Sequence, residues 1–342
     1  MADTPGDLSG DPRTVRAAES SRWHSLPFGA RWCLIFGALG LALVGTVTAL
    51  NSTVYSAAGF VHSYLDSLAA GDSDTALAGA GLLPGAVASA PLLAPVPGEL
   101  DQVQLRSDTV RADGTHLLRF SFTLRGSTRT ASFSVLPDAS RWLVFAHWRF
   151  AVNPIGAVIV TTHSDPHFTA NGHRFTTNGA GASNTYAVLL PAVVTLSHDS
   201  TYLNSVPTRV EIMDAASPAR ASVTPRPKPS LVAEVQKQLT ALLDDCVTQT
   251  VLQPTGCPFG QEISNEVEGV PRWSMRSYPK LTIVPGEVDG TWLVPRTTGT
   301  AHLVVPVRAL FDGSQSIFDQ DVAFSVSYNI SFTASGIAIS AR

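Results

Sequence analysis

Residues 32–50 form an uninterrupted apolar run without a charged side chain. As an α-helix, a run of this length extends about 28 Å, close to the thickness of the hydrocarbon core of a bilayer. Trp32 and Tyr55 lie on either side of it, where aromatic residues are common at membrane interfaces. The run therefore predicts a transmembrane helix within residues 28–53, and it separates a short N-terminal tail from the rest of the chain.

Basic residues flank this run on one side only. Four arginines precede it, and no lysine or arginine follows until Arg106; the four are Arg13, Arg16, Arg22 and Arg31. The positive-inside rule then places the N-terminus in the cytoplasm and the chain after about residue 51 outside. Residues 1–27 mix Asp, Gly, Pro, Ser and Arg with few apolar residues, which is typical of a disordered tail. We therefore expect a single-pass protein of the cell membrane with extracytoplasmic C-terminal domains.

A cleaved secretory signal is the alternative interpretation of the run. Ser56-Ala57-Ala58 offers small residues at which a signal peptidase could cut. The apolar core of a signal peptide is usually about 7 to 15 residues long, shorter than this run, and it rarely follows so long an N-terminal segment. A retained anchor fits better. Within it, small residues four positions apart would let two helices approach closely and form a homo-oligomer; the pairs are Ala38 with Ala42 and Gly45 with Ala49.

Length and charge narrow the classes of protein to which the exported part can belong. The chain has 342 residues, and removing about fifty for the tail and anchor leaves enough for two or three domains. The formal net charge is −4, which provides no electrostatic footprint for DNA or RNA, so we expect no nucleic-acid partner. Only three of the 23 basic residues are lysines, a bias that indicates a GC-rich bacterial genome.

Cysteine usage agrees with export of the chain after the apolar run. Cys33 lies inside the run, whereas Cys246 and Cys257 are the two cysteines of the exported part, eleven residues apart. Thiols outside the cell persist as disulfides, and closing so short a loop should stabilise the fold by about 3 kcal/mol. We therefore predict a Cys246–Cys257 disulfide that ties a helix end to the following loop. Two separate reduced thiols are the alternative.

Residues 54–153 have the pattern of a helix followed by a sheet. An amphipathic helix is expected over residues 54–77, continuing from the anchor, with Gly71 as a stop or kink. Strands with a two-residue period follow, in which Leu118, Phe120, Phe122 and Leu124 alternate with polar residues. Such alternation predicts an antiparallel sheet with one buried face. The α+β unit is expected to have a curved sheet whose core is filled by bulky aromatic side chains, among them Trp142 and Trp148.

Residues 154–222 change to a composition rich in Thr, Val, Asn and Gly with no helical period. Asn171-Gly172 stands between two short β-like segments, a strong signal for a two-residue hairpin turn. We expect a small all-β domain here. Closely spaced prolines, Pro218, Pro225, Pro227 and Pro229, mark its end and predict a stiff, extended linker over residues 223–229.

Residues 230–342 repeat the order of helix and then sheet. Ser230 is expected to cap a helix that runs to about Thr248, with its apolar face formed by Leu231, Val235, Leu239, Leu242 and Cys246. The strands that follow alternate strictly, with Val322, Phe324, Val326, Tyr328, Ile330 and Phe332 on one face. A second α+β domain is therefore expected, and a duplication of the first is one interpretation. The Trp-containing strand comes late in the first domain and early in the last, which argues against a simple repeat.

Two segments resemble parts of known families. Val61 to Ala78, with Tyr64-Leu65 and Ala70-Gly71-Asp72-Ser73-Asp74, resembles the first helix of NTF2-like domains in bacterial envelope proteins. The Asn-Gly hairpin, Leu190-Pro191 and Tyr202-Leu203 are similar to features of the small β domains in membrane-anchored envelope proteins of the teicoplanin-resistance-associated (TcaA) type, which also contain NTF2-like modules. The resemblance implies two NTF2-like domains flanking the β domain and an envelope-associated binding role. The cytoplasmic zinc ribbon common in that family is absent from this sequence.

Potential metal ligands are densest at His163, Asp165, His167 and His173. On adjacent strands of a hairpin, His167 and His173 could share a zinc ion with Asp165 as a third ligand. The spacing matches no standard site, however, and exposed histidines are ordinary in a polar β domain. We therefore predict no metal site and no cofactor.

Catalytic motifs do not point to an enzyme. The sequence has no Gly-x-Ser-x-Gly elbow, Walker loop, dinucleotide fingerprint or H-E-x-x-H helix. Asp244 and Asp245 could serve in a cavity that raises a carboxylate pKa, but solvated acids on a helix surface are the simpler interpretation. His116 and His147 are expected to be structural.

We expect a membrane-anchored, extracytoplasmic binding or scaffold protein of the bacterial cell envelope that is not an enzyme. Its partner would be an envelope protein or a cell-wall polymer. The alternative is a small-molecule-binding or catalytic cavity inside one of the NTF2-like cones. A sensor that signals inward is disfavoured, because the cytoplasmic tail has no domain to receive the signal.

Overall fold

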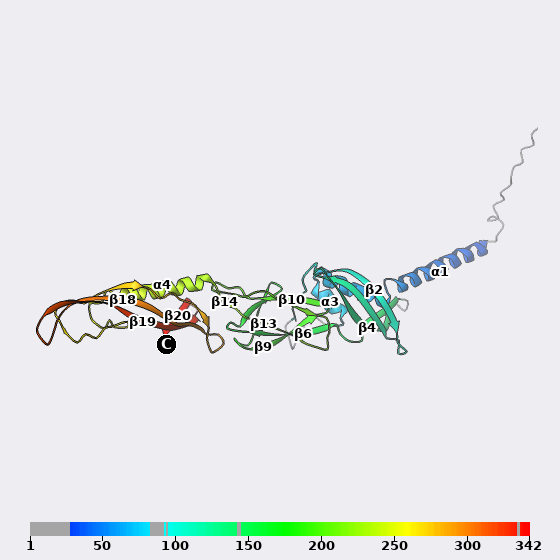
Figure 1. The fold of residues 1–342 in the computed structure, drawn as a ribbon. Coiled ribbons are helices and arrows are strands. Elements are labelled where there is room, and N and C mark those ends of the chain that lie inside the picture. Colours follow the sequence, from blue (N-terminus) through cyan, green and yellow to red (C-terminus); the bar gives the residue numbers. More distant parts are fainter. Residues whose placement is uncertain (1–27, 83–91, 94, 142–144, 334–335) are drawn as a thin grey trace, which may run out of the picture.

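The computed structural model describes residues 28–82, 92–93, 95–141, 145–333 and 336–342. A long helix projects from one end, and three units follow it in a line (Figure 1). We call them the proximal, middle and distal units: residues 57–150, residues 155–227 and residues 229–341, in order of distance from the helix. Strand β1, Leu92–Leu93, is the exception, because it lies within the proximal range but pairs with the middle unit.

Helix α1, Phe28–Ser52, contains the predicted apolar run. Its segment Trp32–Ser52 is long and apolar enough to cross a membrane, and none of that segment is buried by the rest of the protein. A water-soluble fold would bury such a surface, because each exposed apolar area carries a free-energy cost in water. Among the residues that the structure describes, the prediction of one helix able to span a bilayer is confirmed.

The helix expected over residues 54–77 is not one helix and does not continue straight from the anchor. Helix α1 ends at Ser52, and two shorter helices follow, α2 at Ala57–Ala70 and α3 at Ser73–Gly79. The side chain of Ser56 caps α2 by accepting a hydrogen bond from Gly59 N at 3.0 Å, so α2 starts anew rather than extending α1. Gly71 ends α2 in a left-handed conformation with φ +76°, as the sequence predicted.

The proximal sheet is antiparallel and has the strand order β2-β3-β4-β5. Its strands are β2 Leu100–Val110, β3 His116–Leu124, β4 Ser127–Arg141 and β5 Phe145–Phe150. The sheet curls into a half-barrel beside α2 (Figure 1). Strand β2 is bulged at two places, and bulges increase the local twist of a strand.

The core of the proximal unit is aromatic. Leu118, Phe120, Phe122 and Leu124 are all buried, which confirms the alternating face predicted for this strand. Tyr64 of α2 meets the rings of Phe133 and Phe150 edge-on, with centroids 6.3 and 5.1 Å apart. Trp148 is partly exposed and packs against this cluster, and Trp142 lies outside the described residues.

The middle unit consists of strands. Two four-stranded sheets, β1-β9-β6-β13 and β12-β10-β7-β8, enclose one hydrophobic cluster. Their strands are β6 Ile155–Thr162, β7 His167–Ala170, β8 His173–Thr176, β9 Ser183–Leu189, β10 Ala192–Ser197, β12 Thr208–Ile212 and β13 Ala219–Val223. The predicted hairpin is confirmed, because β7 and β8 are joined by Asn171 and Gly172, both with positive φ, 50° and 84°.

The proline-rich stretch expected to be a stiff, extended linker over residues 223–229 is paired in part. Strand β13 ends at Val223 and runs parallel to β6. Strand β14, Arg226–Pro227, pairs with β11, Leu203–Asn204. Pro227 and Leu203 are aligned in this ladder, so strand pairing fixes the connection to the middle unit.

The distal unit packs helix α4, Pro229–Cys246, against an antiparallel sheet. Its central strands are long, β18 Trp292–Arg308 and β19 Gln315–Thr333, and β20 Gly336–Ala341 follows β19. Three short strands pair with β18: β15 Glu266–Val267, β16 Arg272–Ser277 and β17 Val284–Pro285. The helix-then-sheet order expected for the C-terminal part is therefore present.

Two details of α4 differ from the prediction. Lys228 rather than Ser230 occupies the capping position, and Pro229 begins the helix, where its missing N–H costs nothing. The hydroxyl of Ser230 instead donates to the carbonyl oxygen of Thr201 at 3.0 Å. On the apolar face, Leu243, four positions after Leu239, is buried, whereas Leu242 is 40% exposed.

The predicted disulfide is confirmed between Cys246 and Cys257. Cys246 is the last residue of α4 and is buried in the distal core. The bridge therefore ties the end of the helix to the following loop. Such a loop closure stabilises a fold mainly by restricting the unfolded chain.

Polar contacts join neighbouring units, in addition to the apolar side chains that their cores share. The buried hydroxyl of Tyr64 donates to the carbonyl oxygens of Leu190 and Pro154, at 2.8 and 3.3 Å. Across the next boundary, the carboxylate of Asp289 accepts a hydrogen bond from Ser164 N at 3.3 Å and lies 3.7 Å from His163. The line of units seen in Figure 1 is therefore linked at both junctions.

Candidate functional site

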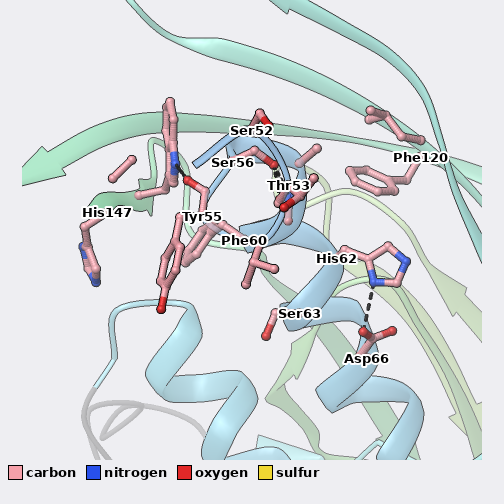
Figure 2. A pocket seen from close by; sticks show the side chains of 16 residues that line it. Ser52, Thr53, Tyr55, Ser56, Phe60, His62, Ser63, Asp66, Phe120 and His147 are labelled. Atoms are coloured by element: carbon pink, nitrogen blue, oxygen red, sulfur yellow. Dashed lines mark hydrogen bonds and ion pairs between the residues drawn. The ribbon is translucent and has the colours of Figure 1, made fainter. Parts of the chain in front are cut away.

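A groove of about 830 Å³ lies where the membrane-spanning helix meets the proximal unit. Its floor and walls come from the α1–α2 turn, one face of α2 and strands β2, β3 and β5 (Figure 2). We call it the membrane-proximal groove. Its lining residues are Ser52, Thr53, Val54, Tyr55, Ser56, Ala58, Gly59, Phe60, His62, Ser63, Asp66, Leu105, Phe120, Ala146, His147 and Trp148.

The α1–α2 turn is held firmly against β5. The Asn51 side chain accepts a hydrogen bond from Ala146 N at 3.1 Å. The indole N–H of Trp148 donates to the carbonyl oxygen of Tyr55 at 2.9 Å, and the Tyr55 ring lies 4.6 Å from that of Phe145. These contacts fix the end of α1 to the sheet, so the groove is held next to the helix that would enter the membrane.

Close backbone packing within the turn requires a glycine. A Cβ atom at Gly59 would lie 2.5 Å from the carbonyl oxygens of Thr53 and Val54, well inside van der Waals contact. Any side chain here would push α2 away from the turn. Gly59 therefore lets the first turn of α2 approach the backbone of the preceding segment and defines one wall of the groove.

The groove is lined mainly by apolar side chains. Val54 and Leu105 are 63% and 43% exposed, whereas Phe120 at the back is fully buried and belongs to the core behind the groove. That core is packed with the rings of Tyr64, Phe133 and Phe150. The volume therefore lies at the surface beside α2, and the space between α2 and the sheet is filled.

Polar side chains lie at two places in the lining of the groove. Figure 2 shows His62 and Asp66 one helical turn apart on α2, with His62 Nδ1 2.9 Å from Asp66 Oδ2. Ser63 lies between them in sequence, and His147 lies on the far side of Tyr55 (Figure 2). Among the side chains that the structure describes, the lining contains a carboxylate, hydroxyls and imidazoles, but neither lysine nor arginine. It therefore offers hydrogen-bond acceptors and no fixed positive charge.

The two histidines predicted to be structural lie near the groove. His147 lines it and is 3.4 Å from the carboxylate of Asp138. His116 hydrogen-bonds to Asp108 at 2.9 Å and meets the Trp148 ring edge-on, at a centroid distance of 4.8 Å. His116 thus packs against the ring of Trp148 and helps to hold it in position.

The carboxylates considered as catalytic candidates lie far from this groove, in the distal unit. Asp244 accepts a hydrogen bond from the hydroxyl of Tyr278, and this bond raises the pKa of Tyr278. Asp244 and Asp245 are both exposed on α4. They are solvated acids on a helix surface, which is the simpler of the two interpretations of their sequence.

The four potential metal ligands of the middle unit are spread out. In the β7–β8 hairpin, His167 is opposite Thr176 and His173 is opposite Ala170, so the two histidines are at opposite ends of the ladder. His167 hydrogen-bonds to Asp165 at 2.8 Å, and His163 faces Asp289 of the distal unit. Within the described part of the chain, no group of three or more His, Cys, Asp or Glu side chains could hold a metal ion.

Sequence reasoning did not identify the groove. Its walls come from segments separated by up to about ninety positions, from Ser52 to Trp148, and no local motif marks them. Two signals were available in the sequence: the apolar Val54-Tyr55 directly after the anchor, and the i, i+4 spacing of His62 and Asp66. The sequence does not show the curl of the sheet. Without it, Val54-Tyr55 are interpreted as ordinary membrane-interface residues, and His62 and Asp66 as ordinary residues of a helix surface.

Comparisons with protein-family models, curated proteins and solved structures gave no match to this chain. The resemblance to TcaA-type and NTF2-like proteins therefore remains a prediction. The position and the lining of the groove are the structural features that bear on function.

Proposed function

We propose that this chain is a membrane-anchored binding or scaffold protein of the bacterial cell envelope that is not an enzyme. In this proposal residues 28–53 anchor it in the cell membrane, the N-terminus is cytoplasmic, and the three units lie outside. The apolar, unburied face of α1 and the Cys246–Cys257 disulfide support this orientation, because disulfides persist in oxidising compartments. The arginines on the N-terminal side of the run support it as well.

We further propose that the proximal and distal units are NTF2-like domains, related in layout to those of TcaA-type envelope proteins. The supporting feature is the combination of a helix with a curled antiparallel sheet in the proximal unit and a helix with a long antiparallel sheet in the distal one. A fold of this kind does not define an activity by itself. The function must therefore come from a particular site.

We propose that the membrane-proximal groove binds an amphiphile from the outer surface of the bilayer that α1 spans. The observation that carries it is position, since the groove begins at Ser52, the last residue of α1, and is lined by the next four residues. Val54 and Tyr55 therefore lie at the depth of lipid head groups and upper acyl chains, the region that aromatic residues prefer. The apolar side chains that the sheet contributes to the groove, among them Leu105 and Trp148, suit an acyl chain.

The polar side chains of the lining select the head group. Asp66 is a hydrogen-bond acceptor, and Ser63 and the imidazoles of His62 and His147 can accept or donate. Because the described residues of the lining include no lysine or arginine, they offer none of the cations that usually bind phosphate. The groove therefore fits an amphiphile whose head group presents hydroxyl or ammonium donors.

The alternative function, a small-molecule-binding or catalytic cavity between α2 and the proximal sheet, has no comparable support. The space between α2 and the sheet is occupied by Tyr64, Phe120, Phe133 and Phe150, all at most 6% exposed. A small-molecule site of that kind needs a concave, open volume.

The linear arrangement of the units suits a scaffold. The distal unit lies farthest from α1 (Figure 1), so it would present its surface to an envelope protein or a cell-wall polymer away from the membrane. Homo-oligomerisation through the small residues of α1 would place several such arms side by side. These roles are compatible with an amphiphile in the groove, which would fix the proximal unit against the bilayer.

The test uses the full chain in nanodiscs that contain equal amounts of monoglucosyl diacylglycerol and dioleoylphosphatidic acid in a phosphatidylcholine background. Lipids retained after release from the disc are identified by native mass spectrometry. Two variants form a matched pair: Leu105→Asp places a charge in the groove, and Leu242→Asp places one at an equally exposed leucine of the distal unit, 43% against 40% exposed.

We expect the wild type and Leu242→Asp to retain the glucolipid, and Leu105→Asp to lose it. Asp66→Asn should reduce the preference for glucolipid over phosphatidic acid, because an amide is a weaker acceptor than a carboxylate. Retention that is the same in Leu105→Asp and the wild type, or no retention at all, would overturn the groove as a lipid site. Preferential retention of phosphatidic acid would overturn the assigned head-group chemistry.

A further inference from the structure

The tip of the β18–β19 hairpin, residues 309–314, exposes a cluster of apolar side chains to solvent. Phe311 is fully exposed, Leu310 is 73% exposed, and Ile317 at the start of β19 is 67% exposed. Ile317 lies opposite Pro306, which is also exposed. Single apolar residues on a surface are ordinary, but an exposed group of them usually marks an interaction site.

The tip is held in a defined shape. Ala309 N donates to Ser314 O at 2.9 Å, and Gly313 N donates to Ala309 O at 3.0 Å. The carboxylate of Asp312 accepts from Ser314 N and Ser314 Oγ, at 3.0 and 2.8 Å, which lowers the pKa of Asp312. Gly313 supplies the positive φ, +73°, that this turn requires. A preordered loop loses less conformational entropy on binding than a mobile one.

The base of the hairpin is braced as well. Strand β15 pairs with the end of β18, where Glu266 is opposite Arg308 and Val267 is opposite Val307. Glu268 forms an ion pair with Arg308 and accepts a hydrogen bond from Gln315 at 2.8 Å. The exposed rings and methyl groups are therefore carried on a supported two-stranded arm at the end of the molecule farthest from α1 (Figure 1).

Charge around the tip selects the kind of partner. Residues 305–318 and 266–268 contain three carboxylates, Asp312, Glu266 and Glu268, and one guanidinium, Arg308, which is paired with Glu268. Bacterial and cytoplasmic membrane surfaces are anionic and attract basic segments, so an acidic tip is unsuited to a lipid surface. A protein pocket with an apolar floor and a rim of lysine or arginine complements both features.

We propose that this tip is a docking element: Leu310 and Phe311 enter an apolar pocket with a basic rim on a second envelope protein. An aromatic residue at the centre of such a contact is typical of the residues that dominate binding energy. The inference rests on the proposed extracytoplasmic position of the distal unit but not on the lipid groove, because the two sites lie at opposite ends of the protein (Figure 1).

The test uses the full chain in its native membrane, with a photoreactive residue at the tip. Phe311→p-benzoylphenylalanine keeps an aromatic ring at the contact. The matched control is Val206→p-benzoylphenylalanine, because Val206 is 70% exposed but lies in the middle unit. Adducts formed on irradiation are digested, and the cross-linked peptides are sequenced by mass spectrometry, with and without Leu310→Asp and at two salt concentrations.

We expect a protein adduct from position 311 and none from position 206. The attached peptide should contain apolar residues flanked by lysine or arginine, and the yield should fall about tenfold with Leu310→Asp and also fall at high salt. Equal adducts at both positions, adducts to lipid or to another copy of this chain, or a yield unaffected by Leu310→Asp would overturn the proposal. Unchanged thermal unfolding of Leu310→Asp would show that the substitution leaves the fold intact.

Discussion

The proximal and distal units both pack a helix on an antiparallel sheet, but they are stabilised by different interactions. In the proximal unit, α2 has 14 residues and meets a core of aromatic rings. In the distal unit, α4 has 18 residues and covers a sheet face that mixes aliphatic side chains, such as Leu303 and Val305, with the buried ring of Trp292. The distal helix is also fixed by a disulfide, for which the proximal helix has no counterpart.

The two units also differ in where they lie. The proximal unit is fastened at both ends, to α1 through Asn51 and Trp148 and to the middle unit through Tyr64. The distal unit has a neighbour on one side and an extended hairpin on the other. A unit with a free end gains from a covalent link that restricts its unfolded chain. The same arrangement of a helix on a sheet can thus be stabilised by contacts with neighbouring units in one domain and by a disulfide in another.

The largest expected effects come from removing one buried ring from each core. Phe120 and Trp292 are both fully buried, and truncating such a side chain typically costs about 3 to 5 kcal/mol. Phe120→Ala should lower the unfolding transition of the proximal unit alone, and Trp292→Ala that of the distal unit alone. Calorimetry of the full chain measures both transitions. If either substitution moved all transitions together, the three units would form one cooperative block and the comparison would fail.

Breaking the disulfide should affect the distal unit and spare the proximal one. Replacing both bridge residues, Cys246→Ser with Cys257→Ser, should cost about 3 kcal/mol, the stabilisation typical of a short closed loop. Hydrogen exchange followed by mass spectrometry resolves the two units in the same sample. Faster exchange in α4 with unchanged exchange in α2 is the expected pattern, and equal changes in both helices would contradict it.

Removing one hydroxyl should loosen the proximal unit from the middle one. Tyr64→Phe keeps the ring but leaves the buried carbonyl oxygen of Leu190 without its donor. An unsatisfied buried acceptor typically costs about 1 to 3 kcal/mol. Chemical denaturation of the wild type and Tyr64→Phe measures the difference. Tyr186→Phe is a suitable control, because Tyr186 donates only within the middle unit, to Thr176 O at 3.2 Å.

The stabilisation provided by the Tyr64 hydroxyl should disappear at alkaline pH. Burial raises the pKa of Tyr64 well above its usual value near 10, so the folded protein retains a proton that the unfolded chain releases. The stabilisation is therefore fully present below about pH 10 and is lost above it, by about 1.4 kcal/mol per pH unit for one group. Denaturation of the wild type and Tyr64→Phe from pH 8 to 11 should show the two stabilities converging. A constant difference across this range would contradict the buried position of the hydroxyl.

The smallest effect is expected at the exposed contact between the same two units. Arg129 donates two hydrogen bonds to the carboxylate of Glu211, at 2.9 and 3.0 Å, and this lowers the pKa of Glu211. The pair stabilises the fold above the usual carboxyl pKa and loses this effect as Glu211 is protonated at lower pH. Because exposed ion pairs contribute little, Arg129→Ala should lower stability less than Tyr64→Phe does. A larger loss would make this ion pair, rather than the Tyr64 hydroxyl, the main contact at the junction.

Elements with strong local signals could be predicted from the sequence. The apolar run gave α1, the alternation from Leu118 to Leu124 gave the buried face of β3, and Asn171-Gly172 gave the β7–β8 turn. Pairings between distant short segments could not be predicted. Leu92–Leu93 runs parallel to β9, and β13 runs parallel to β6, although no helical crossover or periodic pattern indicates either.

The groove was beyond sequence reasoning for the same physical reason. Its shape depends on the turn at residues 53–56, where Gly59 approaches two carbonyl oxygens closely, and on the curl that brings β2 and β5 to the same side of α2. The sequence suggested one continuous helix from the anchor, and a continuous helix would have no such turn. Local helix propensity could not reveal a break that is stabilised by contacts from β5, about ninety positions later.

The most direct test of the account is whether the groove of the proximal unit lies in contact with bilayer lipid while the distal unit lies away from it. The full chain in nanodiscs containing brominated acyl chains should show tryptophan fluorescence quenching with a component from Trp148, which lines the groove. Trp148→Phe should remove that component, whereas Trp273→Phe, at a buried position of the distal unit, should leave the quenched component unchanged. Equal effects of the two substitutions, or no loss with Trp148→Phe, would contradict the assignment of the groove to the membrane surface.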